Sequence, residues 1–66
     1  MNAHEERVVH EFEQLLEKWE KLRAFIDISD IYKGLPETEK LLLNAQLCAM
    51  GTYLSILAMR IDKFEK

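Results

Sequence analysis

The longest uncharged stretch of this sequence runs from Leu41 to Met59 and contains 19 residues. In and just beyond it, apolar residues recur alternately every four and every three positions, the spacing of a helix with a continuous apolar stripe. The residues of that stripe are Leu43, Leu47, Met50, Leu54, Leu57, Ile61 and Phe64. More apolar side chains lie beside the stripe, so a helix over residues 37–64 would be buried on nearly every side.

Residues 2–28 are predicted to form the first helix of the chain, with the same alternating spacing on one side only, and residues 37–64 the second. Its apolar stripe consists of Val8, Phe12, Leu15, Trp19, Leu22 and Ile26. Its acidic face contains Glu6, Glu13, Glu17 and Glu20. Asn2 and Glu5 have the spacing of a capping box, which would begin the helix. Glu17 and Lys21 are four residues apart, with Glu first, the better order for an ion pair along a helix.

Residues 29–36 connect the two predicted helices. Gly34 and Pro36 interrupt the helical pattern there, and Gly34 can supply a positive φ. The apolar side chains of Ile31, Tyr32 and Leu35 predict a short helical turn packed onto the helices. The fold expected for residues 1–66 is therefore a single all-α domain, an antiparallel two-helix hairpin.

A chain of 66 residues rarely folds without a disulfide, a metal or a partner. Cys48 is the single cysteine, so an intrachain disulfide is excluded, and we interpret it as a small buried side chain. Because one helix can cover only one side of the other, we expect a homo-oligomeric helical bundle. Its predicted interface is Leu43, Leu47, Met50, Leu54, Leu57 and Ile61.

The uncharged stretch is also long enough for a transmembrane helix. Polar residues are spread through it, namely Asn44, Gln46, Gly51, Thr52 and Ser55. These residues, and an amphipathic first helix of matching spacing, favour a bundle, so no membrane contact is predicted. The N-terminal residues do not resemble a secretory signal, and the lone cysteine fits a reducing compartment, so the expected location is the cytoplasm.

Charge and residue spacing exclude several functions. A net charge of −3 argues against binding to duplex nucleic acid, which requires a basic surface. Glu6, His10 and Glu13 share a helical face but lack the Glu-x-x-His pattern of bundle metal sites, so we predict neither a metal nor another cofactor. Since no nucleophile and base are paired in the sequence, we expect a protein that is not an enzyme.

Three features suggest a binding site. Tyr32 and Lys33 precede the second helix, where an aromatic ring, a cation and backbone N–H groups suit an anion and a base. Arg60 stands among apolar residues and needs an acidic partner or a phosphate. Tyr53 lies in the uncharged stretch and needs a hydrogen-bond partner if it is buried. Each also has an ordinary structural explanation, as a loop anchor, an ion pair or a core residue.

Residues 22–61 resemble a group of small phage and prophage helical-hairpin proteins. The matching pattern is Leu22-x-x-Phe25-Ile26, then Tyr32-Lys33-x-Leu35-Pro36-x-x-Glu39-x-x-Leu42-Leu43-x-x-Gln46-x-x-x-Met50-x-x-Tyr53-x-x-x-Leu57-x-x-Arg60-Ile61. The group includes anti-CBASS and anti-Thoeris sponges, homo-oligomers, often hexamers, that sequester cyclic oligonucleotides made by host defence systems. The resemblance implies a phage-encoded sponge for cyclic di- or trinucleotides, acting in the cytoplasm of the infected bacterial host cell.

In part of that group a tyrosine before a helix stacks on a base, and a basic residue on the helix holds a phosphate. Tyr32 matches the tyrosine, whereas Leu47 stands where the basic residue is expected. The residues then expected to bind the ligand are Tyr32, Lys33, Lys40, Tyr53 and Arg60. Two alternatives remain open: an inhibitor that contacts another protein through the acidic first helix, resembling an anti-CRISPR or a DNA mimic, and a purely structural oligomer.

Overall fold

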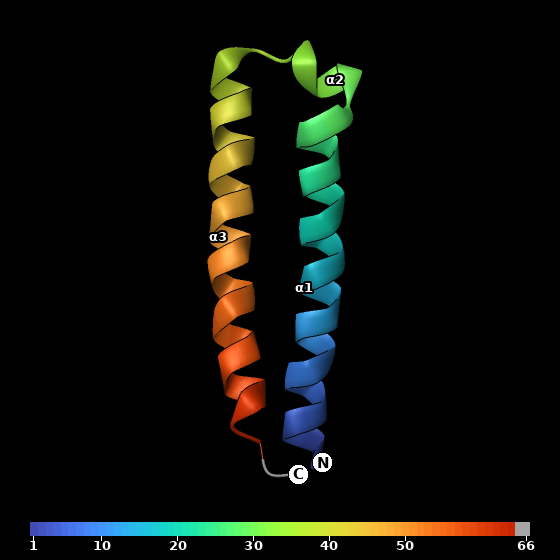
Figure 1. Cartoon of the computed structure of the whole chain (residues 1–66), viewed down its shortest axis with the longest axis vertical. Helices are drawn as coiled ribbons and strands as arrows, with labels where there is room; N and C mark the ends of the chain where they lie inside the picture. The colour runs from blue at the N-terminus through green and yellow to red at the C-terminus, as the bar shows by residue number, and fades with distance from the viewer. Residues whose placement is uncertain (65–66) are drawn as a thin grey trace.

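The computed structural model describes residues 1–64 and consists of two long helices joined by a short one (Figure 1). Helix α1 spans Ala3–Ile28, α2 spans Asp30–Lys33 and α3 spans Glu37–Asp62. Helices α1 and α3 lie side by side and run in opposite directions, which gives a rod of 47 × 15 × 14 Å. The predicted all-helical chain with a pair of long helices is confirmed.

The predicted capping box at the start of α1 is confirmed. The Asn2 side chain accepts a hydrogen bond from the Glu5 N–H at 2.9 Å, and the Asn2 N–H donates to the Glu5 carboxylate at 3.1 Å. The predicted ion pair between Glu17 and Lys21 is also present, at 3.0 Å. These contacts satisfy backbone donors at the N-terminus and support the exposed face of α1.

The connector contains the predicted helical turn, now helix α2, but Ile31 is exposed at 72%, so only Tyr32 and Leu35 are partly buried as predicted. The Ser29 hydroxyl caps α2 by accepting hydrogen bonds from the N–H groups of Ile31, at 3.1 Å, and Tyr32, at 3.4 Å. The suggestion of a positive φ at Gly34 is wrong, because its φ is −86°. Its N–H instead bonds to carbonyls of α2, so the turn closes in ordinary right-handed geometry.

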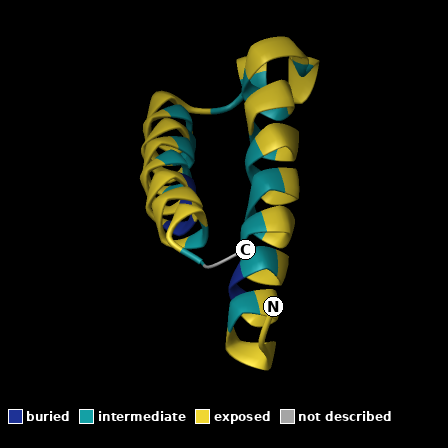
Figure 2. Ribbon diagram, turned by 60° about the horizontal axis from the view of Figure 1, so that its bottom comes forward, coloured by how far each residue is buried: buried dark blue, intermediate teal, exposed yellow. Residues whose placement is uncertain are grey.

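A narrow core runs along the seam between α1 and α3 (Figure 2). Among residues 1–64, the buried apolar side chains are Val8, Leu54 and Leu57, with exposed fractions of 4%, 9% and 0%. Two residues of the predicted oligomer interface, Leu54 and Leu57, lie in this seam, so they have little or no surface left to bury against a second copy. The other predicted interface residues, Leu43, Leu47, Met50 and Ile61, are half-buried in the single chain.

Much apolar surface on α3 remains exposed, as the sequence predicts for a helix with one covering partner. The large apolar side chains concerned are Leu41, Leu42, Tyr53, Ile56 and Met59. The prediction that Cys48 is buried is wrong for the single chain, where its side chain is exposed. The position of Cys48 outside the seam explains this, because α1 covers only one side of α3.

Helix α3 is also long and apolar enough, by length and composition alone, to cross a membrane. Its neighbour α1 carries a row of exposed acidic side chains and leaves most of the apolar stretch uncovered. Both a partner protein and a lipid bilayer are therefore chemically suited to this surface.

Candidate ligand site at the connector

Tyr32 lies at the centre of a cluster where α2 meets the beginning of α3. Its hydroxyl accepts a hydrogen bond of 2.7 Å from the Asn44 side-chain amide, which also donates to the Lys40 carbonyl at 2.8 Å. Its ring contacts Phe25 of α1, with centroids 6.0 Å apart and planes at 83°. Tyr32 is half-buried, so three elements hold the ring in place and part of it faces solvent.

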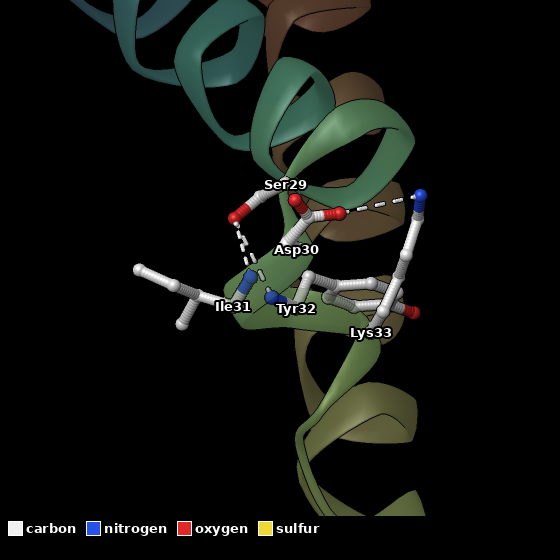
Figure 3. A network of polar contacts seen from close by, with 5 residues as sticks. All are labelled: Ser29, Asp30, Ile31, Tyr32 and Lys33. Atoms are coloured by element: carbon white, nitrogen blue, oxygen red, sulfur yellow. Dashed lines mark hydrogen bonds and ion pairs between the residues drawn. The ribbon is translucent and has the colours of Figure 1, made fainter.

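One lysine lies beside this ring and a second directly follows Tyr32 in the sequence, but their surroundings differ. The Lys40 ammonium lies 5.7 Å from the centroid of Tyr32, within the range of a cation–π contact. No carboxylate among residues 1–64 lies within ion-pair distance of Lys40. The Lys33 ammonium lies 3.6 Å from the Asp30 carboxylate, so a neighbouring negative charge offsets it (Figure 3). Lys40 is therefore the better placed of the two lysines to meet a phosphate.

The N-terminus of α3 is less suited to an anion than the sequence suggests. Glu37 and Glu39 occupy its first turn, and their negative charges offset the positive end of the helix dipole. Pro36 precedes the helix and makes no side-chain capping bond. An anion at this end of the hairpin would depend on Lys40 and Lys33 for attraction.

The predicted site residues do not all meet within one chain. Tyr32, Lys33 and Lys40 gather at the connector. Tyr53 lies 13 residues beyond Lys40 on the same helix, hence about 20 Å away, and Arg60 lies about 30 Å away. Both side chains are exposed, and Tyr53 keeps 43% of its surface in contact with solvent. Tyr53 and Arg60 therefore reach a ligand at a connector only from another copy of the chain.

Two residues of the cluster were not among the predicted site residues. The sequence marks Asn44 only as a polar residue of the uncharged stretch, yet its side-chain amide joins the Tyr32 hydroxyl to the backbone of α3. Phe25 stands out in the sequence only within the pattern of the resemblance, yet its ring packs against the Tyr32 ring. Asn44 stands one turn after Lys40, and this spacing was the available signal that it belongs to the same site. Sequence spacing does not reveal, however, that α2 folds back onto this turn of α3.

Other surface features lie away from this cluster. An open, mostly apolar groove of about 350 Å³ lies between the two long helices near the chain termini, lined by Val9, Phe12 and Ile61 among others. On α1, the Arg23 guanidinium lies 5.3 Å from the Trp19 ring centroid and 3.6 Å from the Asp27 carboxylate. Within residues 1–64, no three His, Cys, Asp or Glu side chains are grouped to hold a metal ion.

Comparisons with known proteins relate the chain to one family. Neither the curated proteins nor the solved structures contain a match to it. A family model described as Sequestin matches residues 2–63, which is nearly the whole chain and includes both long helices and the connector. The family name indicates small proteins that bind and sequester, in agreement with the sequestering role that the resemblance to phage sponges implies. The chain therefore belongs to the Sequestin family.

Proposed function

We propose that this protein is a phage-encoded sponge that binds cyclic di- or trinucleotide signals of bacterial anti-phage defence and withholds them from their receptors. It acts without catalysis, in the cytoplasm of the infected cell and as a homo-oligomer. Membership of the Sequestin family supports sequestration in general. The observation that supports a nucleotide in particular is the Tyr32 ring, held in place beside the ammonium of Lys40.

The chemistry of this pair matches the two parts of a nucleotide. An exposed tyrosine ring stacks on any base, with a free energy of about 1–3 kcal/mol per base. A lysine resting on a ring at an exposed site gains about 0.5–1 kcal/mol, and a charge-assisted bond to phosphate is stronger than an ordinary hydrogen bond. Binding would therefore move Lys40 from the ring to a phosphate and free the ring for a base.

The overall negative charge does not oppose this role. Attraction of a small anion depends on the charges near the site. Asp30, Glu37 and Glu39 accompany the two lysines at the connector, so the attraction depends on Lys40, which pairs with no carboxylate within residues 1–64. Because one connector supplies few cations and one ring, a ligand with several bases and phosphates would draw on more than one copy. Tyr53 and Arg60 are proposed as contacts from such neighbouring copies.

Isothermal titration calorimetry against a panel of cyclic di- and trinucleotides tests this function. We expect saturable heat with at least one member, and affinity that falls as salt is raised, because phosphate contacts are screened. The linear dinucleotide of the same bases is the matched control for the cyclic form. Absence of heat with every cyclic nucleotide at protein concentrations of tens of micromolar would refute the proposal.

The two connector lysines give a second test. Replacing Lys40 with methionine is expected to weaken nucleotide binding roughly tenfold, about 1.4 kcal/mol, because a charge-assisted contact is lost while the apolar stem remains. The matched variant Lys33→Met should have a smaller effect, since Asp30 already offsets that charge. Equal losses in the two titrations would show that Lys40 has no special contact with the ligand.

Inhibition of another protein is the second candidate. Glu6, Glu13 and Glu20 are exposed on α1, and none of them pairs with a cation within residues 1–64. An acidic row of this kind suits a basic protein surface. Charge reversal on this row distinguishes the two functions, because it should leave binding of a nucleotide at the connector largely unchanged.

A further inference from the structure

The side of α3 that α1 leaves uncovered has a regular spacing of its own. Its residues are Leu42, Ala45, Ala49, Thr52, Ile56 and Met59, which we name the outer stripe. They are separated by three and four residues in alternation and lie about 150° around the helix from the seam. All six are exposed, with Leu42 and Met59 each at 60% and Ile56 at 47%. A second alternating stripe on one helix predicts a second helical partner.

The sizes of these residues favour an antiparallel copy of the same helix. If a two-fold axis passes between residues 50 and 51, positions equally distant from the axis face each other. Ala45 then meets Ile56 of the other copy, and Ala49 meets Thr52. At each end Leu42 meets Met59. Ile56, the one large residue between the ends of the stripe, is thus opposed by the small Ala45, and the central pair of Ala49 and Thr52 lets the two helices approach closely.

The charges at the ends of the stripe support the same orientation. Glu37 and Glu39 lie in the first turn of α3, while Arg60 lies in its last turn, followed by Lys63. In an antiparallel pair, the acidic end of one copy meets the basic end of the other, and the helix dipoles are also opposed. A parallel pair would bring like charges together. Lys40 lies on the opposite side of the helix, whereas Asp62 lies about 110° around the helix from the outer stripe, as far as Glu39, and offsets part of this match.

We propose that a second copy of this chain covers the outer stripe, with α3 packed antiparallel on α3 about an axis between residues 50 and 51. The inference rests on the self-association proposed above and specifies its surface, orientation and register. It also places the Tyr53 residues of the two copies on the same face of the helix pair, roughly 7.5 Å apart along the helix direction. The aromatic surface in this region is therefore completed only by the pair.

Disulfide cross-linking in a Cys48→Ala background tests the register. The variant with Ala45→Cys and Ile56→Cys together is expected to form a covalent dimer on mild oxidation, because each cysteine faces its counterpart across the interface. Within one chain these positions are about 16 Å apart along α3, too far for an intrachain bond. Ala45→Cys alone is the matched control and should remain uncrosslinked. Efficient cross-linking of that control would indicate a parallel pair and overturn the proposal.

Sedimentation velocity of charge variants tests the surface. Ala49→Glu places a charge at the centre of the outer stripe. It is expected to raise the dissociation constant for self-association at least tenfold, so that at 50 µM the variant sediments as a monomer or as a smaller oligomer than the wild type. Ala24→Glu makes the same change on the exposed face of α1 and should leave association unchanged. A wild-type protein that stays monomeric, or that co-sediments with phosphatidylcholine–phosphatidylglycerol vesicles instead, would overturn the proposal.

These measurements fail independently of the proposed function. A dimer with the expected cross-links that takes up no cyclic nucleotide would support the pairing and refute the sponge. A protein that binds nucleotides but cross-links through Ala45→Cys alone would leave the sponge standing and refute the register.

Discussion

Replacing Leu57 with alanine is expected to destabilise the hairpin by about 2–5 kcal/mol, enough to leave most of the chain unfolded. Leu57 has an exposed fraction of 0%, and only Val8 and Leu54 join it as buried apolar residues within residues 1–64. A single core in a chain of this size rarely supplies more than about 3–5 kcal/mol, so one cavity removes a large share of the stability. Urea titration followed by far-UV circular dichroism measures the loss.

Ile28→Ala is the control for this prediction. Ile28 stands at the end of α1 with an exposed fraction of 75%, so a truncation of similar size should cost less than about 0.5 kcal/mol. Comparable losses for Leu57→Ala and Ile28→Ala would mean that the seam between α1 and α3 is not the main source of stability.

Replacing Tyr32 with alanine is expected to weaken binding of the cyclic nucleotide by roughly 10- to 100-fold, corresponding to the loss of one stacked base. Tyr32→Phe keeps the ring and removes the hydroxyl that accepts the 2.7 Å hydrogen bond from Asn44. It should cost only a few-fold in affinity, since an ordinary hydrogen bond contributes about 1 kcal/mol. Calorimetric titration of the three proteins separates stacking from positioning.

The neighbouring residue provides the control for a general disturbance of α2. Ile31 is exposed at 72% and projects away from Tyr32 and Lys33 (Figure 3). Ile31→Ala should therefore bind the nucleotide as the wild type does, with an unchanged melting temperature. If Ile31→Ala weakens binding as much as Tyr32→Ala, the effect arises from the shape of the connector and not from the tyrosine ring.

The two long helices and their start signals were predictable because they depend on local chemistry. The alternating apolar spacing on both segments defines which side of each helix is buried, and the capping box satisfies the N–H groups of Asn2 and Glu5, which are only three residues apart. The predicted end at residue 64 overshoots α3, which ends at Asp62. The N–H groups of Lys63 and Phe64 make tighter bonds to Arg60 and Ile61, a detail of the last turn that apolar spacing does not report.

The candidate site was predictable only in part. Tyr32 and Lys33 stand next to each other in the sequence, so their proximity needs no tertiary information. Lys40 approaches the Tyr32 ring because α2 turns the chain back onto the first turns of α3. The distance that separates Arg60 from this cluster follows from the length of α3. For the same reason, one hairpin cannot bring all the predicted ligand-binding residues into one site.

By itself, the sequence determined that this chain forms two long helices and that α3 has more apolar surface than one neighbour can cover, since both follow from periodicity and composition. Only the tertiary structure decided how that surface is divided. Contact with α1 buries Leu54 and Leu57 in the seam and leaves Leu42, Ile56 and Met59 to solvent. The physical reason is that periodicity shows which residues share a side of a helix, whereas packing shows which side its neighbour occupies.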